Sequence, residues 1–211
     1  MTQGKQDTEA RRLEELWSGQ FGDAYVGRNA NASNGRDAFW KTILTKYAPH
    51  SVCEVGCNIG GNLRWIAEIL PPAFVWGIDV NETALGKLRA AVPGVKAVHA
   101  TAKELPFADG QFDLVFTAGV LIHQPESSLK DVMSEVVRCS KRYVLCMEYF
   151  SPETVEVPYR GQEGALFKRD YGRLYAEAFP ELRLLEKGHL DKDQGWDDVT
   201  YWLFEKSGDA R

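Results

Sequence analysis

The sequence has 211 residues, of which 44% are hydrophobic and 26% are charged, and its net charge is −5. This length suits one domain with a sizeable core, and the negative balance excludes a broad basic face for nucleic acid. No apolar run reaches membrane-spanning length and the charged start is no signal peptide, so we expect a cytoplasmic protein without nucleic-acid or membrane partners.

The N-terminal part is predicted to contain two helices separated by a loop. Residues 8–18 place apolar side chains at helical spacing. The stretch 19–37 is rich in Gly and Asn and is typical of a loop. Asp37 is then expected to cap a second helix over about 38–47.

From Ser51 onward, apolar runs alternate with helical patterns. The predicted strands are 51–56, 74–79, 95–99, 112–118 and 142–149. The predicted helices are 61–70, 81–91 and 126–140, with a short turn near 102–105. Continuous apolar strands suit a sheet that is covered on both faces, and the alternation implies a parallel, doubly wound α/β sheet.

The last third is predicted to complete a seven-stranded, Rossmann-like sheet. A long connection over 151–168 leads to a helix at about 169–178. Two further strand-like runs, ELRLLEKGHL and VTYWLFEK, are separated only by DKDQGWDD, which favours an antiparallel hairpin at the end of the sheet. The four cysteines match no zinc-knuckle spacing, so we expect buried free thiols and no metal site.

The stretch SVCEVGCNIGGNLRW, which begins at Ser51, is typical of a strand, a glycine turn and a helix. Ligands of doubly wound sheets bind outside the carboxyl ends of the strands, so this turn is a candidate site. Gly56 and Gly60 allow a close backbone approach, whereas Asn58 stands at the middle glycine of a dinucleotide fingerprint. Glu54 precedes the turn. These residues leave three alternatives open: a nicotinamide enzyme, another adenosine-cofactor enzyme, or a turn without a ligand.

Further segments narrow these alternatives. EVGCNIGGNL, GIDVN, ATAKELPFADGQFDLVFTAGVLIH and the terminal hairpin resemble, in order and spacing over about residues 50–206, class I S-adenosylmethionine (SAM)-dependent methyltransferases. The resemblance implies that fold, SAM as cofactor and S-adenosylhomocysteine as product. It implies an N-terminal helical lid over 1–49 and a methyltransferase core over 50–211, within one domain. SAM carries no phosphate but an ammonium group, so an acid before the turn suits it better than NAD.

The resemblance also assigns roles to matching residues. Glu54 and the turn would hold the methionine end of SAM, Asp79 would bind the ribose hydroxyls, and Thr101 would face the adenine edge. Many members carry an acid at the position of Thr101, so this residue departs from the pattern. The residues implied in cofactor binding are Glu54, Gly56, Asn58, Gly60, Asp79, Val80, Thr101, Ala102 and Ala118.

The N-terminal segment offers two more candidates for cofactor binding. Tyr25 is expected to close over SAM, although it could instead pack within the lid. Arg28 is expected to pair with the SAM carboxylate, although it could be a surface arginine. WSGQFGDAYVGRN, LFKRDY and GHLDKDQGWDDVTYWLFEK are moreover similar to methylases associated with pseudaminic acid (nonulosonic sugar) biosynthesis. This likeness implies a small polar acceptor, such as a sugar or sugar acid, that is methylated on O or N.

Loops at the carboxyl edge should line the acceptor pocket. Arg160, Lys168 and Arg169 could hold a carboxylate or phosphate on the acceptor, and His189 is a weaker candidate. His123 follows the fourth strand and is a candidate general base, with a structural histidine as the alternative.

Tyr149 ends the fifth strand beside Glu148, and the alternation of a strand sends one of the two into the pocket. We predict Tyr149 as a second catalytic residue. An NAD-linked oxidoreductase and a non-catalytic SAM-binding protein remain as alternatives, and the oligomeric state is left open.

Overall fold

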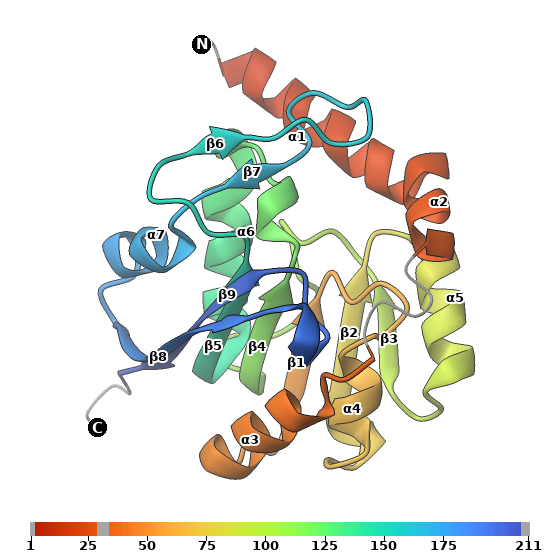
Figure 1. The fold of residues 1–211 in the computed structure, drawn as a ribbon, viewed down its shortest axis with the longest axis vertical. Helices are drawn as coiled ribbons and strands as arrows, with labels where there is room; N and C mark the ends of the chain where they lie inside the picture. Colours follow the sequence, from red (N-terminus) through yellow and green to blue (C-terminus); the bar gives the residue numbers. More distant parts are fainter. Residues whose placement is uncertain (1–2, 29–33, 208–211) are drawn as a thin grey trace.

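The computed structural model describes residues 3–28 and 34–207 (Figure 1). Within them, seven strands form one sheet in the order β3-β2-β1-β4-β5-β9-β8. Their bounds are β1 Val52–Val55, β2 Val75–Asp79, β3 Lys96–His99, β4 Phe112–Ala118, β5 Ser140–Glu148, β8 Leu182–Leu190 and β9 Val199–Lys206. β1 to β5 are parallel, and β9 is antiparallel to both β5 and β8. The predicted seven-stranded sheet with its antiparallel hairpin is confirmed.

Helices cover both faces of this sheet. On one face lie α3 Asp37–Tyr47, α4 Leu63–Ala67 and α5 Glu82–Ala91, and on the other lie α6 Glu126–Cys139 and α7 Tyr171–Ala178. The side chains of β4 alternate accordingly: Leu114 and Phe116 pack in the core cluster on the side of α3, α4 and α5, and Val115 packs in the cluster on the side of α6 and α7. All four cysteines are buried and free, as predicted. No helix in the described part of the chain is long and apolar enough to cross a membrane.

The N-terminal helices differ from their prediction. α1 Gln3–Ser18 is followed by α2 Gln20–Arg28, so residues 20–28 of the predicted loop are helical, and residues 29–33 of it lie outside the described residues. Gly22 allows α2 to pack tightly, because a Cβ there would lie 1.8 Å from the carbonyl oxygen of Trp17. Figure 1 shows α1 and α2, called the lid helices below, across one edge of the sheet.

The start of α3 also corrects a prediction. Asp37 is the first residue of the helix, and Arg36 occupies the N-cap position without a capping side-chain bond. α3 belongs to the hydrophobic core, because Trp40 is fully buried and its ring centroid lies 4.7 Å from that of Phe116. The Arg36 side chain donates instead to the carbonyl oxygen of Gly195, between β8 and β9, at 2.9 Å.

The long connection after β5 contains a small sheet that the sequence analysis missed. β6 Val155–Glu156 pairs with β7 Phe167–Lys168, and strands of two residues are too short for a periodic pattern. The connection reaches the lid, since Arg12 of α1 donates to the carbonyl oxygen of Glu163 at 2.9 Å. Figure 1 shows β6 and β7 beside α1.

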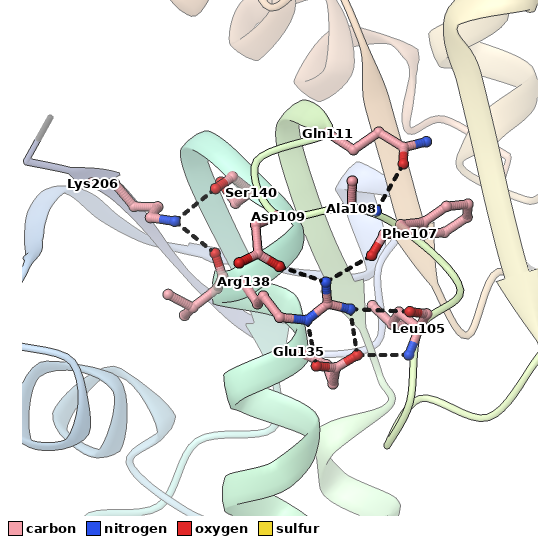
Figure 2. A network of polar contacts seen from close by, with 10 residues as sticks. Leu105, Phe107, Ala108, Asp109, Gln111, Glu135, Arg138, Ser140 and Lys206 are labelled. Carbon is pink, nitrogen blue, oxygen red and sulfur yellow. Dashed lines mark hydrogen bonds and ion pairs between the residues drawn. The ribbon is translucent and has the colours of Figure 1, made fainter.

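A polar network fixes the segment between β3 and β4 (Figure 2). Arg138 of α6 donates to the carbonyl oxygens of Leu105 and Phe107 at 3.0 and 2.7 Å. The same guanidinium is paired with Glu135 and Asp109, and Glu135 accepts from the Leu105 amide. One arginine thereby ties the segment to α6, and that segment carries part of the cavity wall described next.

Candidate active site

A cavity of about 560 Å³ opens at the carboxyl ends of the parallel strands. It is lined by the lid helices, by the segments that follow β1 to β5, and by the loop between β8 and β9. In a doubly wound sheet this edge is where ligands bind, and the volume suits a small-molecule ligand.

The glycine turn after β1 forms the floor of the cavity. Gly56 has φ +74°, and a Cβ there would lie 2.3 Å from Val120 Cγ2, so only glycine fits. Asn58 also has positive φ, at +48°, and its amide donates to Asp79 Oδ2 at 2.7 Å. The turn is therefore anchored to the end of β2.

Glu54 is a buried carboxyl group at the end of β1. Its Oε1 accepts from Asn62 Nδ2 at 2.6 Å, whereas its Oε2 is buried without a hydrogen-bond partner among the described residues. Burial raises the pKa of Glu54 to about 8, against the opposing effects of the Asn62 hydrogen bond and the Arg36 charge. The side-chain oxygen of Asn58 is a second buried acceptor without a partner among these residues.

Arg36 brings a guanidinium group to the same end of the cavity. It donates to Asn62 Oδ1 and to the Gly195 carbonyl oxygen, both at 2.9 Å. Its Cζ lies 4.0 Å from the ring centroid of Trp196, whose indole N–H is buried and lacks a partner among the described residues. A cation and an indole donor therefore lie close to the carboxyl group of Glu54.

The other end of the cavity lies at the carboxyl end of β2, which finishes at Asp79. Asp79 accepts from the backbone amides of Asn58 and Asn81, at 2.7 and 2.8 Å, and burial raises its pKa. Asn81 in turn donates to the carbonyl oxygen of Trp17 and to Asp23 of α2, both at 3.1 Å. Asp79 and Asn81 thus link the sheet edge to the lid helices.

Thr101 meets a carboxylate from the lid. Its hydroxyl donates to Glu14 Oε2 at 3.1 Å, and Lys103 Nζ lies 2.6 Å from the same oxygen. Glu14 and Thr101 both line the cavity. A carboxylate from α1 therefore stands beside Thr101 at the cavity wall.

Aromatic side chains form the wall around His123. Its ring centroid lies 4.4 Å from that of Trp17 and 5.3 Å from that of Tyr159. Nδ1 lies 2.5 Å from the Ala165 carbonyl oxygen and must donate to it, so Nε2 carries the lone pair of the neutral ring. Burial lowers the pKa of His123 to about 4.

Comparison with known proteins shows which proteins this chain is similar to. Residues 52–142 match a protein family described as a methyltransferase domain. The fold is similar to that of 1,6-didemethyltoxoflavin-N1-methyltransferase from Burkholderia thailandensis, solved with bound 1,6-didemethyltoxoflavin and S-adenosylhomocysteine. The TM-score is 0.71 at 13% identity, over 98% of this chain and 91% of that chain. The chain therefore has the class I methyltransferase fold, and its residues 52–142 are similar to a methyltransferase domain.

Two curated relatives are similar to parts of this chain. The uncharacterized methyltransferase sll0829 of Synechocystis sp. is 31% identical over 131 residues, which are 59% of this chain and 61% of that protein. The phthiotriol/phenolphthiotriol dimycocerosates methyltransferase of Mycobacterium tuberculosis is 35% identical over 89 residues, 41% of this chain and 32% of that protein. The chain therefore matches less than two thirds of the length of either relative.

Most of the residues predicted for the site meet in this one cavity. Those that line it are Tyr25, Glu54, Gly56, Asn58, Asp79, Val80, Thr101, Ala102, Ala118, His123 and Tyr149. Gly60 is absent from the described lining. It has φ +78° and faces Leu88, so it shapes the turn from behind.

The structure places the predicted basic residues outside the described cavity lining, and Lys168 Nζ lies 5.8 Å from the ring centroid of the lining residue Tyr149. Arg28, Arg160, Lys168, Arg169 and His189 are all outside the described lining of the cavity. Arg169 is only 2% exposed and donates to the Gln124 carbonyl oxygen. Arg28 lies over the rings of Phe21 and Tyr25, Arg160 lies near the ring of Tyr159, and His189 points to Asp198.

Lining residues that the sequence analysis did not name include Arg36, Asn62 and Trp196. Asn62 stands inside the quoted glycine stretch and could have been chosen as a polar partner of Glu54. Arg36 lies in an Asn- and Gly-rich segment that carries no recognisable motif. Its bond to Gly195 spans 159 residues of sequence, which no local pattern reveals.

Proposed function

We propose that the methyltransferase domain binds SAM and transfers its methyl group to an oxygen or nitrogen atom of a small polar metabolite. One observation carries the proposal. Glu54 Oε2 and Asn58 Oδ1 are two buried acceptors without partners among the described residues, beside a turn that only glycine can make. Unpaired buried acceptors are costly, so they indicate a ligand that brings N–H donors, such as an ammonium group.

The other polar groups of the cavity fit the remaining parts of SAM. The guanidinium of Arg36 and the indole N–H of Trp196 would hold a carboxylate, a role first predicted for Arg28. Asp79 would accept from the ribose hydroxyls, and Val80 and Ala102 would pack beside the adenine. Glu14, held by Thr101 and Lys103, stands at the same end.

When bound, SAM supplies a methyl group on a positively charged sulfur with a neutral thioether as leaving group. The residues of this chain need to align the acceptor and exclude water. We propose that the lid helices exclude water. Trp17 and Tyr25 both line the cavity, and their rings pack edge to face with centroids 5.3 Å apart. The predicted division into a lid over 1–49 and a core over 50–211 stays a prediction, and α3 packs within the core.

For the acceptor we propose a sugar or sugar acid. Support comes from the sequence likeness to the pseudaminic acid-associated methylases and from a polar cavity end with Tyr149, Asp197 and His123. The relatives are named for other acceptors, a mycobacterial phthiotriol lipid and a toxoflavin precursor, and these names belong to those proteins. His123 and Tyr149 remain the proposed catalytic residues.

Calorimetry with SAM and S-adenosylhomocysteine tests the proposal directly. We expect both to bind the folded protein, and radiolabelled methyl transfer should then identify acceptors from a panel of sugars and sugar acids. Absence of binding to correctly folded protein would refute the function. Stabilisation by NAD alone would favour an oxidoreductase, and binding without any transfer would favour a non-catalytic SAM-binding protein.

A further inference from the structure

One face of the lid helix α1 lines the cavity. The side chains that do so stand at positions i, i+3, i+4 and i+7 of the helix, and they are Ala10, Leu13, Glu14 and Trp17. Glu14 is the charged member of this set. Glu15, the next residue, is exposed and lies outside the described lining. The helix therefore presents the carboxylate of Glu14 to the cavity.

Two residues that follow β3 hold this carboxylate by one of its oxygens. The Thr101 hydroxyl donates to Glu14 Oε2 at 3.1 Å, and Lys103 Nζ lies 2.6 Å from the same oxygen. The Glu14 side chain is 33% exposed, so it stands at the rim of the cavity and remains accessible. Because both contacts are made by Oε2, Oε1 can accept a hydrogen bond from a ligand without breaking either contact.

The helix that carries Glu14 is itself fixed on both sides of this residue. Two positions before it, Arg12 donates to the carbonyl oxygen of Glu163 at 2.9 Å. Three positions after it, the carbonyl oxygen of Trp17 accepts from Asn81 Nδ2 at 3.1 Å. Glu14 thus has a defined place relative to the ends of β2 and β3.

Small apolar side chains line the cavity beside this carboxylate. They belong to the ends of β2 and β3 and to the residues that follow, and they are Ile78, Val80, Ala100 and Ala102. The two segments run side by side, since the Ala100 amide donates to the Asp79 carbonyl oxygen at 3.2 Å. Such a surface suits an apolar ring, and a carboxylate at its edge suits a ring that carries an N–H donor.

We infer that Glu14 determines which nucleobase the cofactor carries, because its Oε1 accepts a hydrogen bond from the exocyclic amine of adenine. This inference rests on the proposed function, in which the adenine lies beside Val80 and Ala102. A carboxylate favours an amine at that ring position. It disfavours a carbonyl oxygen there, since two acceptors would then face each other. The lid helix thereby contributes to recognition of the base.

Two ligands that differ at this edge of the base test the inference. S-Inosylhomocysteine has a carbonyl oxygen where S-adenosylhomocysteine has the amine. In calorimetric titrations of the wild-type protein, we expect S-adenosylhomocysteine to bind about tenfold more tightly or better. Glu14→Gln should bring this ratio close to one, because a side-chain amide offers both a donor and an acceptor. Glu15→Gln, which removes the same charge from the exposed face of α1, should keep the wild-type ratio.

A second variant leaves the charge of Glu14 in place. Thr101→Val removes one of the two groups that hold Oε2, so we expect a ratio between those of the wild type and Glu14→Gln. Circular dichroism and urea unfolding show whether each variant folds. If Glu14→Gln does not fold, Thr101→Val carries the test, and an unchanged ratio in it would contradict the inference.

The ratio separates base recognition from a purely structural role. Equal weakening of both ligands in Glu14→Gln would show that the carboxylate only ties α1 to Thr101 and Lys103, and would overturn the inference. Equal binding of the two ligands by the wild type, or equal ratios in Glu14→Gln and Glu15→Gln, would also overturn it. Absence of S-adenosylhomocysteine binding by the folded wild type would refute the proposed function, whereas binding without discrimination would refute only the role of Glu14.

Discussion

Asn62 donates its side-chain amide to Glu54 Oε1 at 2.6 Å, and the two residues lie only eight positions apart on either side of the glycine turn. This bond fixes the plane of a carboxyl group that is 2% exposed. It leaves Oε2 buried and without a partner among the described residues. The charge state of Glu54 should therefore depend on whether a cationic group lies beside Oε2.

Cofactor binding should release a proton from Glu54. With a pKa of about 8, the carboxyl is largely protonated at pH 7 in the free protein, and an adjacent ammonium group favours the ionised form. We expect about one proton to be released per S-adenosylhomocysteine bound at pH 7. Calorimetry in buffers of different ionisation enthalpy measures this number. Glu54→Gln should release none, and equal release by both proteins would contradict the assignment.

The same carboxyl should make the ligand-free protein less stable as the pH rises. In the unfolded chain a glutamate has a pKa of about 4.3, so between that value and about 8 the folded state holds a proton that the unfolded state lacks. The free energy of unfolding should therefore fall across this window. Urea unfolding at several pH values measures the slope. Glu54→Gln should flatten it, and an unchanged slope in this variant would refute the buried acid.

Arg36 should contribute only to the binding of the amino-acid part of the cofactor. We expect Arg36→Gln to weaken S-adenosylhomocysteine about tenfold or more, since a charge-assisted bond to the carboxylate is lost. 5′-Methylthioadenosine, which lacks the amino-acid part, should bind nearly as in the wild type. Arg28→Gln is the matched control, because Arg28 lies outside the described cavity lining. Equal weakening of both ligands would indicate a general structural effect.

Asp79, in contrast, should contribute equally to the binding of both ligands. Its carboxylate serves the ribose side and accepts from the amides of Asn58 and Asn81. Asp79→Asn is therefore expected to weaken S-adenosylhomocysteine and 5′-methylthioadenosine alike, by about tenfold or more. Parallel calorimetric titrations give the two ratios. Wild-type dissociation constants for both ligands would remove Asp79 from the ribose site.

The sheet could be predicted because its signals are local. Each of these core strands is a short, mostly apolar run, and the turn residues that separate the runs stand beside them in the sequence. The glycine turn was found for the same reason. Its position at the carboxyl edge follows from the parallel topology alone.

The rest of the site depends on contacts between distant segments. Glu14 reaches Thr101 across 87 residues and Tyr149 reaches Asp197 across 48, so neither pair has a local pattern. Charge alone also misled the choice of acceptor residues. Arg169 stands in a basic loop, but its guanidinium is buried against the Gln124 carbonyl oxygen. Tertiary packing similarly overrides the loop composition of α2.

His123 should affect turnover without affecting cofactor affinity. His123→Ala removes a ring packed between Trp17 and Tyr159 at the acceptor end, and about a tenfold loss of turnover is expected from the misaligned acceptor. Because the pKa of His123 is about 4, the ring is neutral above pH 6, and the loss should be constant from pH 6 to 9.

Labelled methyl transfer to an identified acceptor gives the rates, and calorimetry gives the affinity for S-adenosylhomocysteine. His189→Ala, a histidine outside the described cavity lining, should retain full turnover. Unchanged turnover in His123→Ala would show that the imidazole neither takes the proton nor positions the acceptor.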